Sequence, residues 1–368
     1  MENYEKEIKR EFEEFEKSME SSKPTIMLLG QTGCGKSSLA NLVFGEKIFE
    51  TSDFISQTQE FSIKEGRECN IIDSRGYELS DTSDSYVEEV IQGIKKFEGD
   101  NKNITSIWYC ISIAGKRIQD VDIKLIKKIR ELRNFRDKLK IVFTKSDEDS
   151  VERDTAIEFN KLLKEKLGYE VKTYEISQEE FAKKELEELI RDTAESIDSE
   201  DIRRAFIMAQ KGNLELKKKE ALKIVGVAAA TAATVGASPI PFSDAAVLVP
   251  AQIAMIYQIS RIFGLEKTAN IKGSLGTTLT TVLGKSLAGN LVKLIPGIGT
   301  GIGAMINAVI AGGMTGALGY GITENCYSVA KRILNGEKVE IENIFDNEII
   351  KSMLTKENIE KFSKSMKK

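Results

Sequence analysis

The stretch from Gly30 to Ser38, GQTGCGKSS, has the residue types and the spacing suited to holding phosphate groups. Glycines let a loop curl so that successive backbone N–H groups point into one concavity, and the start of a following helix adds partial positive charge. Lys36 is expected to reach the β- and γ-phosphates, and the Ser37 hydroxyl to bind Mg²⁺. The sequence therefore predicts a nucleotide-binding P-loop, with a plain glycine-rich turn as the structural alternative.

Two polar segments further along the chain indicate which nucleotide is bound. Asp73 ends a strand-like run, where a carboxylate can hold Mg²⁺ through water, and the amide of Gly76 can meet a γ-phosphate. Asp147 follows another strand-like run, and its carboxylate can accept hydrogen bonds from N1 and N2 of guanine. Adenine presents an acceptor at N1 instead, which leaves a buried carboxylate unpaired. These residues favour GTP over ATP.

The elements that must position these residues are predicted from alternating strand-like runs and charged helical patterns between Thr25 and about Glu195. The strand-like runs are TIMLLG, EFSIKEG with CNIID, ITSIWYCISI, KLKIVFT and VKTYEIS. Such alternation is typical of βαβ units and a mostly parallel sheet. Before it, an apolar stripe predicts a helix that packs on the body and ends before Pro24. The stripe consists of Tyr4, Ile8, Phe12, Phe15 and Met19.

The composition changes abruptly at Ala221, where Gly, Ala, Val, Ile and Thr begin to dominate. The predicted fold is an α/β P-loop domain, a mostly parallel sheet flanked by helices, followed by an all-α Gly/Ala-rich domain. The predicted segments are an N-terminal amphipathic helix (1–23), a nucleotide-binding G domain (24–197), a charged linker helix (198–220), an apolar helical hairpin domain (221–323), and C-terminal charged helices with a basic tail (324–368).

Composition also excludes several function classes. The formal net charge of -4 argues against nucleic-acid binding, which needs a positive field to displace counterions. The chain has no histidine, which excludes histidine-based triads and histidine metal ligands. Four cysteines without paired spacing and a charged N-terminus predict a protein of the reducing cytoplasm.

The order and spacing of GQTGCGKS, DSRG and TKSD resemble those of Era-like GTPases of the translation-factor superclass, over roughly the first half of the chain. The resemblance implies GTP/GDP and Mg²⁺ as ligands. The implied nucleotide-binding residues are Gly30, Gly33, Cys34, Gly35, Lys36, Ser37, Ser38, Asp73, Gly76, Thr144, Lys145, Asp147 and Ser177. The implied metal ligands are Ser37, Asp73 and a switch threonine. We choose Thr58 for that switch position, with Thr51 as the fallback.

Hydrolysis is expected to be slow. By the same resemblance, the segment Asp73–Gly76 (DSRG) is the third motif. Superclass members that hydrolyse efficiently place a water-orienting glutamine directly after its glycine, where this chain has Tyr77. Potassium-dependent relatives have an asparagine in the P-loop, where this chain has Gly33. The loop is similar to the glycine version of immunity-related GTPases and septins, several of which complete their sites across a dimer. The expected catalytic residues are Lys36, Thr58, Gly76, Glu78 and Arg75, within a G-domain homodimer.

The segment Ala237–Gly264 resembles an uncharacterised helical module that follows many bacterial Era-like GTPase domains and is often predicted to associate with membranes. The residues that carry this resemblance are Pro239, Pro241, Asp244, Pro250, Gln252 and Gly264, and the prolines are expected to separate apolar helices. Residues 221–323 carry six basic and two acidic side chains, a balance of +4 that suits an anionic membrane surface. The uncharged run Leu294–Thr323 is long enough for a membrane span.

Three functions stay open at this stage. The first is a GTPase switch that controls self-association and membrane association, peripheral or integral, at the cytoplasmic face. The second is a soluble GTP-gated module that holds a protein partner. The third, less favoured, is ribosome assembly in the manner of Era, because the net charge of -4 does not suit RNA binding.

Overall fold

The computed structural model describes residues 2–45, 55–56, 61–78, 83–99, 104–146, 150–177, 183–236, 243–266, 303–339, 345 and 347–365. These residues form two compact units. One unit combines Met1–Ser18 with Leu214–Lys368, and the other is Met19–Asn213. The segment boundaries drawn from composition stay predictions.

The unit Met19–Asn213 is built on a seven-stranded sheet with the order β2-β3-β4-β1-β5-β6-β7. The pairs among β4, β1, β5, β6 and β7 are parallel, and β2 and β3 add an antiparallel edge. The strands are β1 (Thr25–Gly30), β2 (Ile55–Ser56), β3 (Phe61–Glu65), β4 (Asn70–Ser74), β5 (Ser106–Ser112), β6 (Leu139–Thr144) and β7 (Thr173–Ile176). The predicted mostly parallel sheet is confirmed, and β2 is an additional strand.

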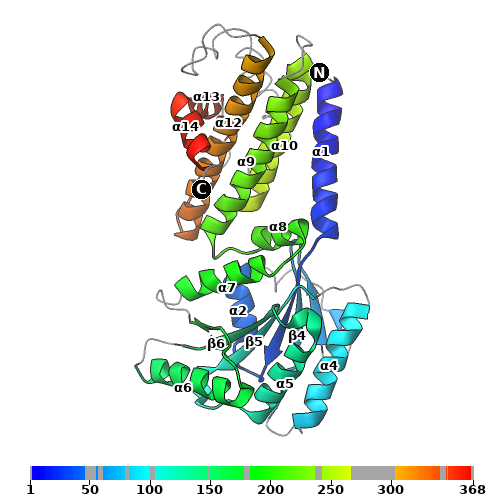
Figure 1. Ribbon diagram of the computed structural model, residues 1–368, viewed down its shortest axis with the longest axis vertical. Helices are drawn as coiled ribbons and strands as arrows, with labels where there is room; N and C mark the ends of the chain where they lie inside the picture. The colour runs from blue at the N-terminus through cyan, green and yellow to red at the C-terminus, as the bar shows by residue number, and fades with distance from the viewer. Residues whose placement is uncertain are drawn as a thin grey trace. The chain divides into compact units, whose positions relative to one another are not determined.

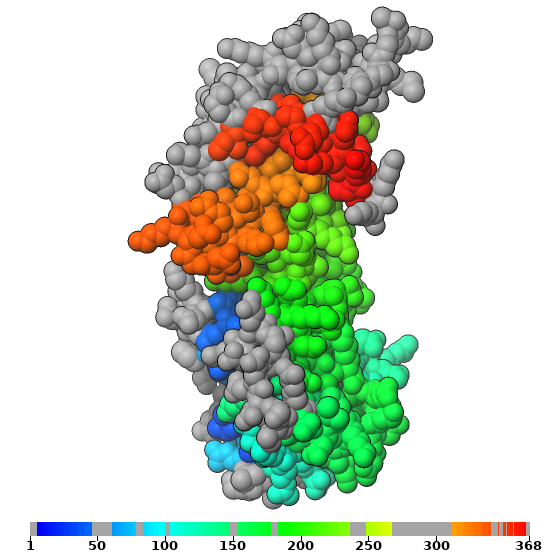
Figure 2. All heavy atoms as spheres, turned by 90° about the vertical axis from the view of Figure 1, so that its left-hand side faces the viewer, coloured from blue at the N-terminus to red at the C-terminus, as the bar shows by residue number. Residues whose placement is uncertain are grey.

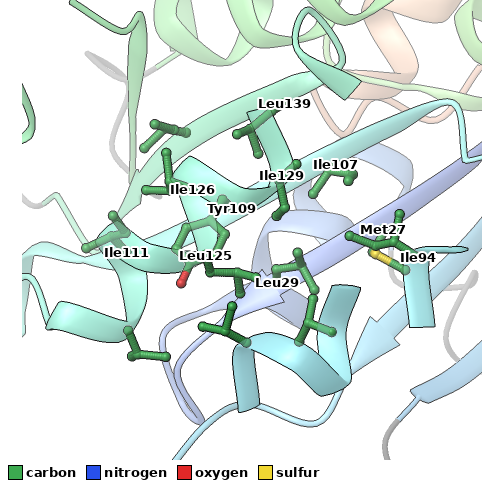
Figure 3. Packing of buried hydrophobic residues seen from close by; sticks show 14 of the residues in the cluster. Met27, Leu29, Ile94, Ile107, Tyr109, Ile111, Leu125, Ile126, Ile129 and Leu139 are labelled. Atoms are coloured by element: carbon green, nitrogen blue, oxygen red, sulfur yellow. The ribbon is translucent and has the colours of Figure 1, made fainter. Parts of the chain in front are cut away.

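Helices cover both faces of this sheet (Figure 1). They are α2 (Lys36–Phe44), α4 (Ser83–Gly99), α5 (Asp120–Glu131), α6 (Ser150–Leu167), α7 (Lys183–Glu195) and α8 (Glu200–Ala209), with short 3-10 turns at Ile113–Gly115 and Arg133–Phe135. Because side chains of a strand alternate between faces, β1 and β5 supply apolar residues to both layers. On one face Met27 of β1 and Tyr109 of β5 belong to one apolar cluster with Leu125 of α5 (Figure 3).

The other face of the sheet carries the largest buried side chain. Trp108 of β5 stacks on Phe44 of α2, with 5.8 Å between ring centroids. Its indole Nε1 donates a 3.2 Å hydrogen bond to Thr193 Oγ1 of α7. A buried indole needs such a partner, and this one fixes α7 against the sheet. The central strands are therefore packed between two helical layers, which fix the position of their carboxyl ends.

The second unit is helical. Its elements are α1 (Glu2–Ser21), α9 (Leu214–Gly236), α10 (Ser243–Phe263), α12 (Gly303–Leu334), α13 (Asn347–Met353) and α14 (Lys356–Ser365). Helices α9, α10 and α12 pack side by side, and α14 lies against α12 (Figures 1 and 2). A Cβ at Gly319 of α12 would lie 2.7 Å from Val225 of α9, so only glycine allows this close approach.

The expected packing of the N-terminal helix on the body is confirmed within this unit. Phe12 of α1 stacks on Tyr257 of α10 at 4.1 Å between ring centroids. The buried guanidinium of Arg261 donates to both carboxylate oxygens of Glu16, at 2.8 and 3.0 Å. A bidentate ion pair and an aromatic stack together fix the register of α1 against α10.

One expectation about the helical unit is wrong. Pro250 lies inside α10 and does not end it, although the missing N–H and the ring disfavour a helix interior. Packing of α10 against α9 and α12 outweighs this local cost. The other two prolines of the module, Pro239 and Pro241, lie outside the described residues, as do residues 294–302 at the start of the run Leu294–Thr323; the rest of that run belongs to α12. None of the helices in the described ranges is long and apolar enough to cross a membrane.

Candidate functional site

The P-loop connects the end of β1 to the start of α2. Gly35 precedes α2 with a φ of 104°, a left-handed conformation that a side chain would strain. A Cβ at Gly30 would overlap the carbonyl oxygen of Cys110, so the loop must leave the strand at a glycine. The first turn of α2 then follows at Lys36. The strand, glycine loop and helix N-terminus expected from the sequence are thus in place. Gly33 is exposed on the loop, and Ser38 is exposed in the first turn of α2.

The side chain of Lys36 folds back onto the P-loop. Its ammonium donates to the carbonyl oxygens of Gly30 at 3.1 Å and Gln31 at 3.2 Å. The side chain is only 8% exposed, so the charge sits at the floor of the concavity. A cation held there attracts phosphate oxygens and can exchange its carbonyl contacts for them.

Ser37 and Asp73 meet beside the P-loop. Ser37 Oγ donates to Asp73 Oδ2 at 3.5 Å. The other oxygen, Asp73 Oδ1, is buried and has no hydrogen-bond partner among the described residues. Burial raises the pKa of Asp73, and the charges of Lys36 and Lys64 oppose this rise. A hydroxyl beside a carboxylate with a vacant oxygen is a donor set that fits Mg²⁺.

The third-motif loop is hydrogen-bonded to the P-loop through Thr32. Thr32 Oγ1 donates to the carbonyl of Gly76 at 3.0 Å, and the Thr32 amide donates to the carbonyl of Tyr77 at 3.2 Å. A Cβ at Gly76 would overlap the Thr32 backbone. Thr32 was missed from the sequence because its position in the P-loop pattern accepts any residue. The two loops therefore form one structural unit.

Tyr77 is buried, and its hydroxyl donates to Asp122 Oδ1 at 2.9 Å. Tyr109 donates to the same oxygen at 2.7 Å, and the backbone N–H of Gln119 donates to Asp122 Oδ2 at 2.8 Å. Burial raises the pKa of Asp122, and these hydrogen bonds oppose the rise. In the sequence, Asp122 is one of several charged residues in a helical pattern and belongs to no motif. The cluster of Tyr77, Tyr109 and Asp122 is therefore not predicted from the sequence.

The two residues expected to assist hydrolysis lie on the surface. Arg75 is exposed and forms a 3.9 Å ion pair with Glu89 of α4. Glu78 is exposed as well. The switch residues Thr58 and Thr51 lie outside the described residues.

The segment expected to contact the guanine base begins at the carboxyl end of β6. The Thr144 hydroxyl is buried and donates to the carbonyl of Cys34, which ties this end of the sheet to the P-loop. Lys145 is exposed with a φ of 57°, an uncommon conformation for a residue with a side chain. The amide of Ser146 donates to the carbonyl of Ile176 at 3.4 Å, which brings the segment near buried Ser177. Asp147 itself lies outside the described residues.

Cys34 contributes to the floor of the P-loop. A side-chain hydrogen bond with Cys110 of β5 lowers the pKa of its thiol, and the charge of Lys36 acts in the same direction against burial. The expected set of residues from Gly30 to Ser38 is thus brought together with Asp73, Gly76 and Thr144 at the carboxyl ends of the parallel strands. This edge is where open α/β sheets bind ligands.

The fold and the site define a class: an α/β domain with a nucleotide-binding P-loop, followed by a helical domain. The model of the AIG1 family matches residues 24–174, which is less than half of the chain and lies within the α/β unit. The match extends from the start of β1 into β7, so it includes the P-loop, the third motif and the end of β6.

Curated relatives match the same region. The chain is 27% identical over 194 residues to Cell division control protein 10 of Saccharomyces cerevisiae, covering 44% of this chain and 58% of that protein. It is 25% identical over 191 residues to the Candida albicans protein of the same name, covering 44% and 52%. It is 27% identical over 126 residues to the Probable GTP-binding protein EngB of Mycoplasmoides gallisepticum, covering 34% and 65%. The chain thus spans between about half and two thirds of the length of these relatives.

Proposed function

We propose that this chain binds GTP and GDP with Mg²⁺ and works as a slowly hydrolysing molecular switch. The observation that carries the proposal is that Lys36 lies on the P-loop, next to Ser37, and that Ser37 contacts Asp73, whose Oδ1 has no hydrogen-bond partner among the described residues. A buried carboxylate oxygen without a partner is costly unless a cation or donor arrives. Bound Mg²⁺ would supply charge neutralisation of the phosphates.

Guanine selectivity rests on the segment after β6. Thr144 holds the start of this segment against the P-loop, and Asp147 three residues later supplies the carboxylate that guanine N1 and N2 require. Similarity to a protein described as probably GTP-binding supports the same nucleotide. Lys145 and Ser177 complete the proposed base pocket.

Slow hydrolysis follows from the position of Tyr77. Its side chain is buried and bonded to Asp122, so it does not orient an attacking water. Arg75 and Glu78 are exposed, so the proposal assigns them to a nucleotide bound across a dimer of G domains. We therefore propose that self-association accelerates hydrolysis.

The test is the GTP hydrolysis rate per molecule as a function of protein concentration. A rate that rises with concentration and falls in Arg75→Ala supports the proposal. Arg67→Ala is the matched control, because Arg67 is also an exposed arginine that pairs with a glutamate, but lies in the β3–β4 turn. A high rate that is independent of protein concentration contradicts it.

The proposed output of the switch is membrane association of the helical unit. The support is the balance of +4 in residues 221–323 within an acidic chain. Co-sedimentation with anionic liposomes in GTP, GDP or no nucleotide tests it. Binding that depends on nucleotide supports the switch, and binding that ignores nucleotide contradicts it.

A soluble GTP-gated module that holds a protein partner is the second candidate. It is favoured by the polar pairing inside the helical unit, where Gln252 donates a buried 2.8 Å hydrogen bond to Thr315. Such satisfied polar contacts suit a bundle whose helices face one another. Absence of liposome binding in every nucleotide state favours this candidate. Ribosome assembly stays a third and less favoured candidate.

A further inference from the structure

The loop Arg75–Tyr77 is anchored at each of its three residues. The Tyr86 hydroxyl of α4 donates to the Arg75 carbonyl at 3.0 Å. Thr32 donates to the carbonyls of Gly76 and Tyr77. The Tyr77 side chain then reaches Asp122 on α5. The segment Arg75–Tyr77 is thus held by the P-loop on one side and by two helices, α4 and α5, on the other.

Asp122 is a firm anchor point. Its side chain is 2% exposed, one oxygen accepts from two tyrosines, and the other accepts from the backbone at the start of α5. Leu125 and Ile126, one turn later on α5, belong to the apolar core that also contains Tyr109 (Figure 3). The carboxylate position is therefore set by the helix and the sheet, independently of the third-motif loop.

We propose that Tyr77 is a positioning residue: its hydroxyl, held by Asp122, places the Gly76 peptide for contact with the terminal phosphate of a nucleoside triphosphate. The inference rests on the proposed function. Gly76 and Tyr77 share a peptide bond, so fixing the Tyr77 side chain limits where the Gly76 backbone can lie. A diphosphate lacks the terminal phosphate that Gly76 is proposed to contact, so this anchor favours GTP over GDP.

The hydrogen bond between Tyr77 and Asp122 explains why tyrosine suits this position better than glutamine. A glutamine at this position could orient water, but its side chain is shorter than that of tyrosine and would not reach Asp122 from the loop. It would also lack the ring that packs beside Tyr86, with 5.7 Å between the ring centroids of Tyr77 and Tyr86. The position is therefore used for recognition of the triphosphate, and water positioning falls to other residues.

The test compares Tyr77→Phe with Tyr109→Phe. Both changes remove one hydroxyl that donates to Asp122 Oδ1, but only Tyr77 belongs to the third-motif loop. Isothermal titration calorimetry of the full chain with GTPγS and with GDP, both with Mg²⁺, gives the affinity ratio. Tyr77→Phe is expected to weaken GTPγS about 5- to 10-fold and to leave GDP within about 2-fold. Tyr109→Phe is expected to leave the ratio unchanged.

A second measurement separates positioning from general loss of stability. Hydrogen–deuterium exchange of the nucleotide-free chain should show faster exchange around Gly76 in Tyr77→Phe and not in Tyr109→Phe. An equal change of the GTPγS/GDP ratio in both variants, or an unchanged ratio in Tyr77→Phe, overturns the inference while leaving the proposed function intact. A wild-type chain that binds neither nucleotide overturns both.

Discussion

Asp73→Asn is expected to stabilise the nucleotide-free chain and to remove most of its stabilisation by Mg²⁺ and GDP. The reason is that Asp73 carries a buried oxygen without a partner among the described residues, and burial raises its pKa above the ordinary value of 3.8. A carboxyl whose pKa is raised by folding is destabilising in its charged form. This penalty is present at neutral pH and disappears as the pH falls below the unfolded pKa, where the group is neutral in both states.

The magnitude follows from the surroundings of the carboxylate. Asparagine keeps a polar atom at this position, so the change removes only the cost of burying the charge, and the attraction of Lys36 and Lys64 is lost with that charge; the net gain in the free energy of unfolding is about 1 kcal/mol. A gain of about 1 kcal/mol raises Tm by about 2–4 °C for a domain of this size. GDP at 100 times its Kd raises the free energy of unfolding of the wild type by about 2.7 kcal/mol. At the same GDP concentration, a variant that binds 100-fold more weakly gains only about 0.4 kcal/mol.

The assay is thermal unfolding at pH 7 in EDTA, and then with Mg²⁺ and GDP. Asp137→Asn is the control, because Asp137 is an exposed aspartate on the same unit, and both its Tm values should match the wild type. A nucleotide-free Asp73→Asn chain that unfolds well below the wild type refutes the stability argument, and a variant that GDP and Mg²⁺ stabilise as much as the wild type refutes the metal assignment.

Three further predictions concern single side chains. Lys36→Ala should weaken GDP binding about 100-fold in a fluorescent-nucleotide titration, because it removes the charge at the loop floor, and binding within 3-fold of wild type would contradict the phosphate role. Glu16→Gln should cost about 1–2 kcal/mol in urea unfolding because it leaves the buried Arg261 less compensated, whereas Glu13→Gln, in an exposed pair with Lys9, should cost less than about 0.5 kcal/mol. Gly319→Ala should cost about 1–3 kcal/mol by forcing α12 away from Val225, and an unchanged unfolding midpoint would show that the helices can separate freely.

The sequence predicts the parts of this protein that follow local rules. The P-loop is recognisable because its glycines, lysine and hydroxyl are adjacent in the chain, and alternating apolar runs mark β1 and β3–β7. The stripe with Phe12 and Phe15 predicts that α1 packs on the body, and both residues contact Tyr257. Each of these features depends on spacing within one short segment.

The features that the sequence does not predict depend on distant residues. Thr32 and Gly76 are 44 positions apart, and Tyr77 and Asp122 are 45 apart, so no local pattern connects them. From the sequence alone, Tyr77 indicates only that the water-orienting glutamine is absent, whereas the structure shows its hydroxyl bonded to Asp122. Pro250 is the opposite case, since a strong local rule is overridden by packing of α10.

The most direct test of the central claim is calorimetric titration of the full chain with GDP and with ADP in the presence of Mg²⁺. The account predicts that GDP binds at least about 100-fold more tightly than ADP, and that Asp147→Ala removes most of this preference. Equal affinity for the two nucleotides, or tighter binding of ADP, would contradict the assignment of a guanine-nucleotide switch.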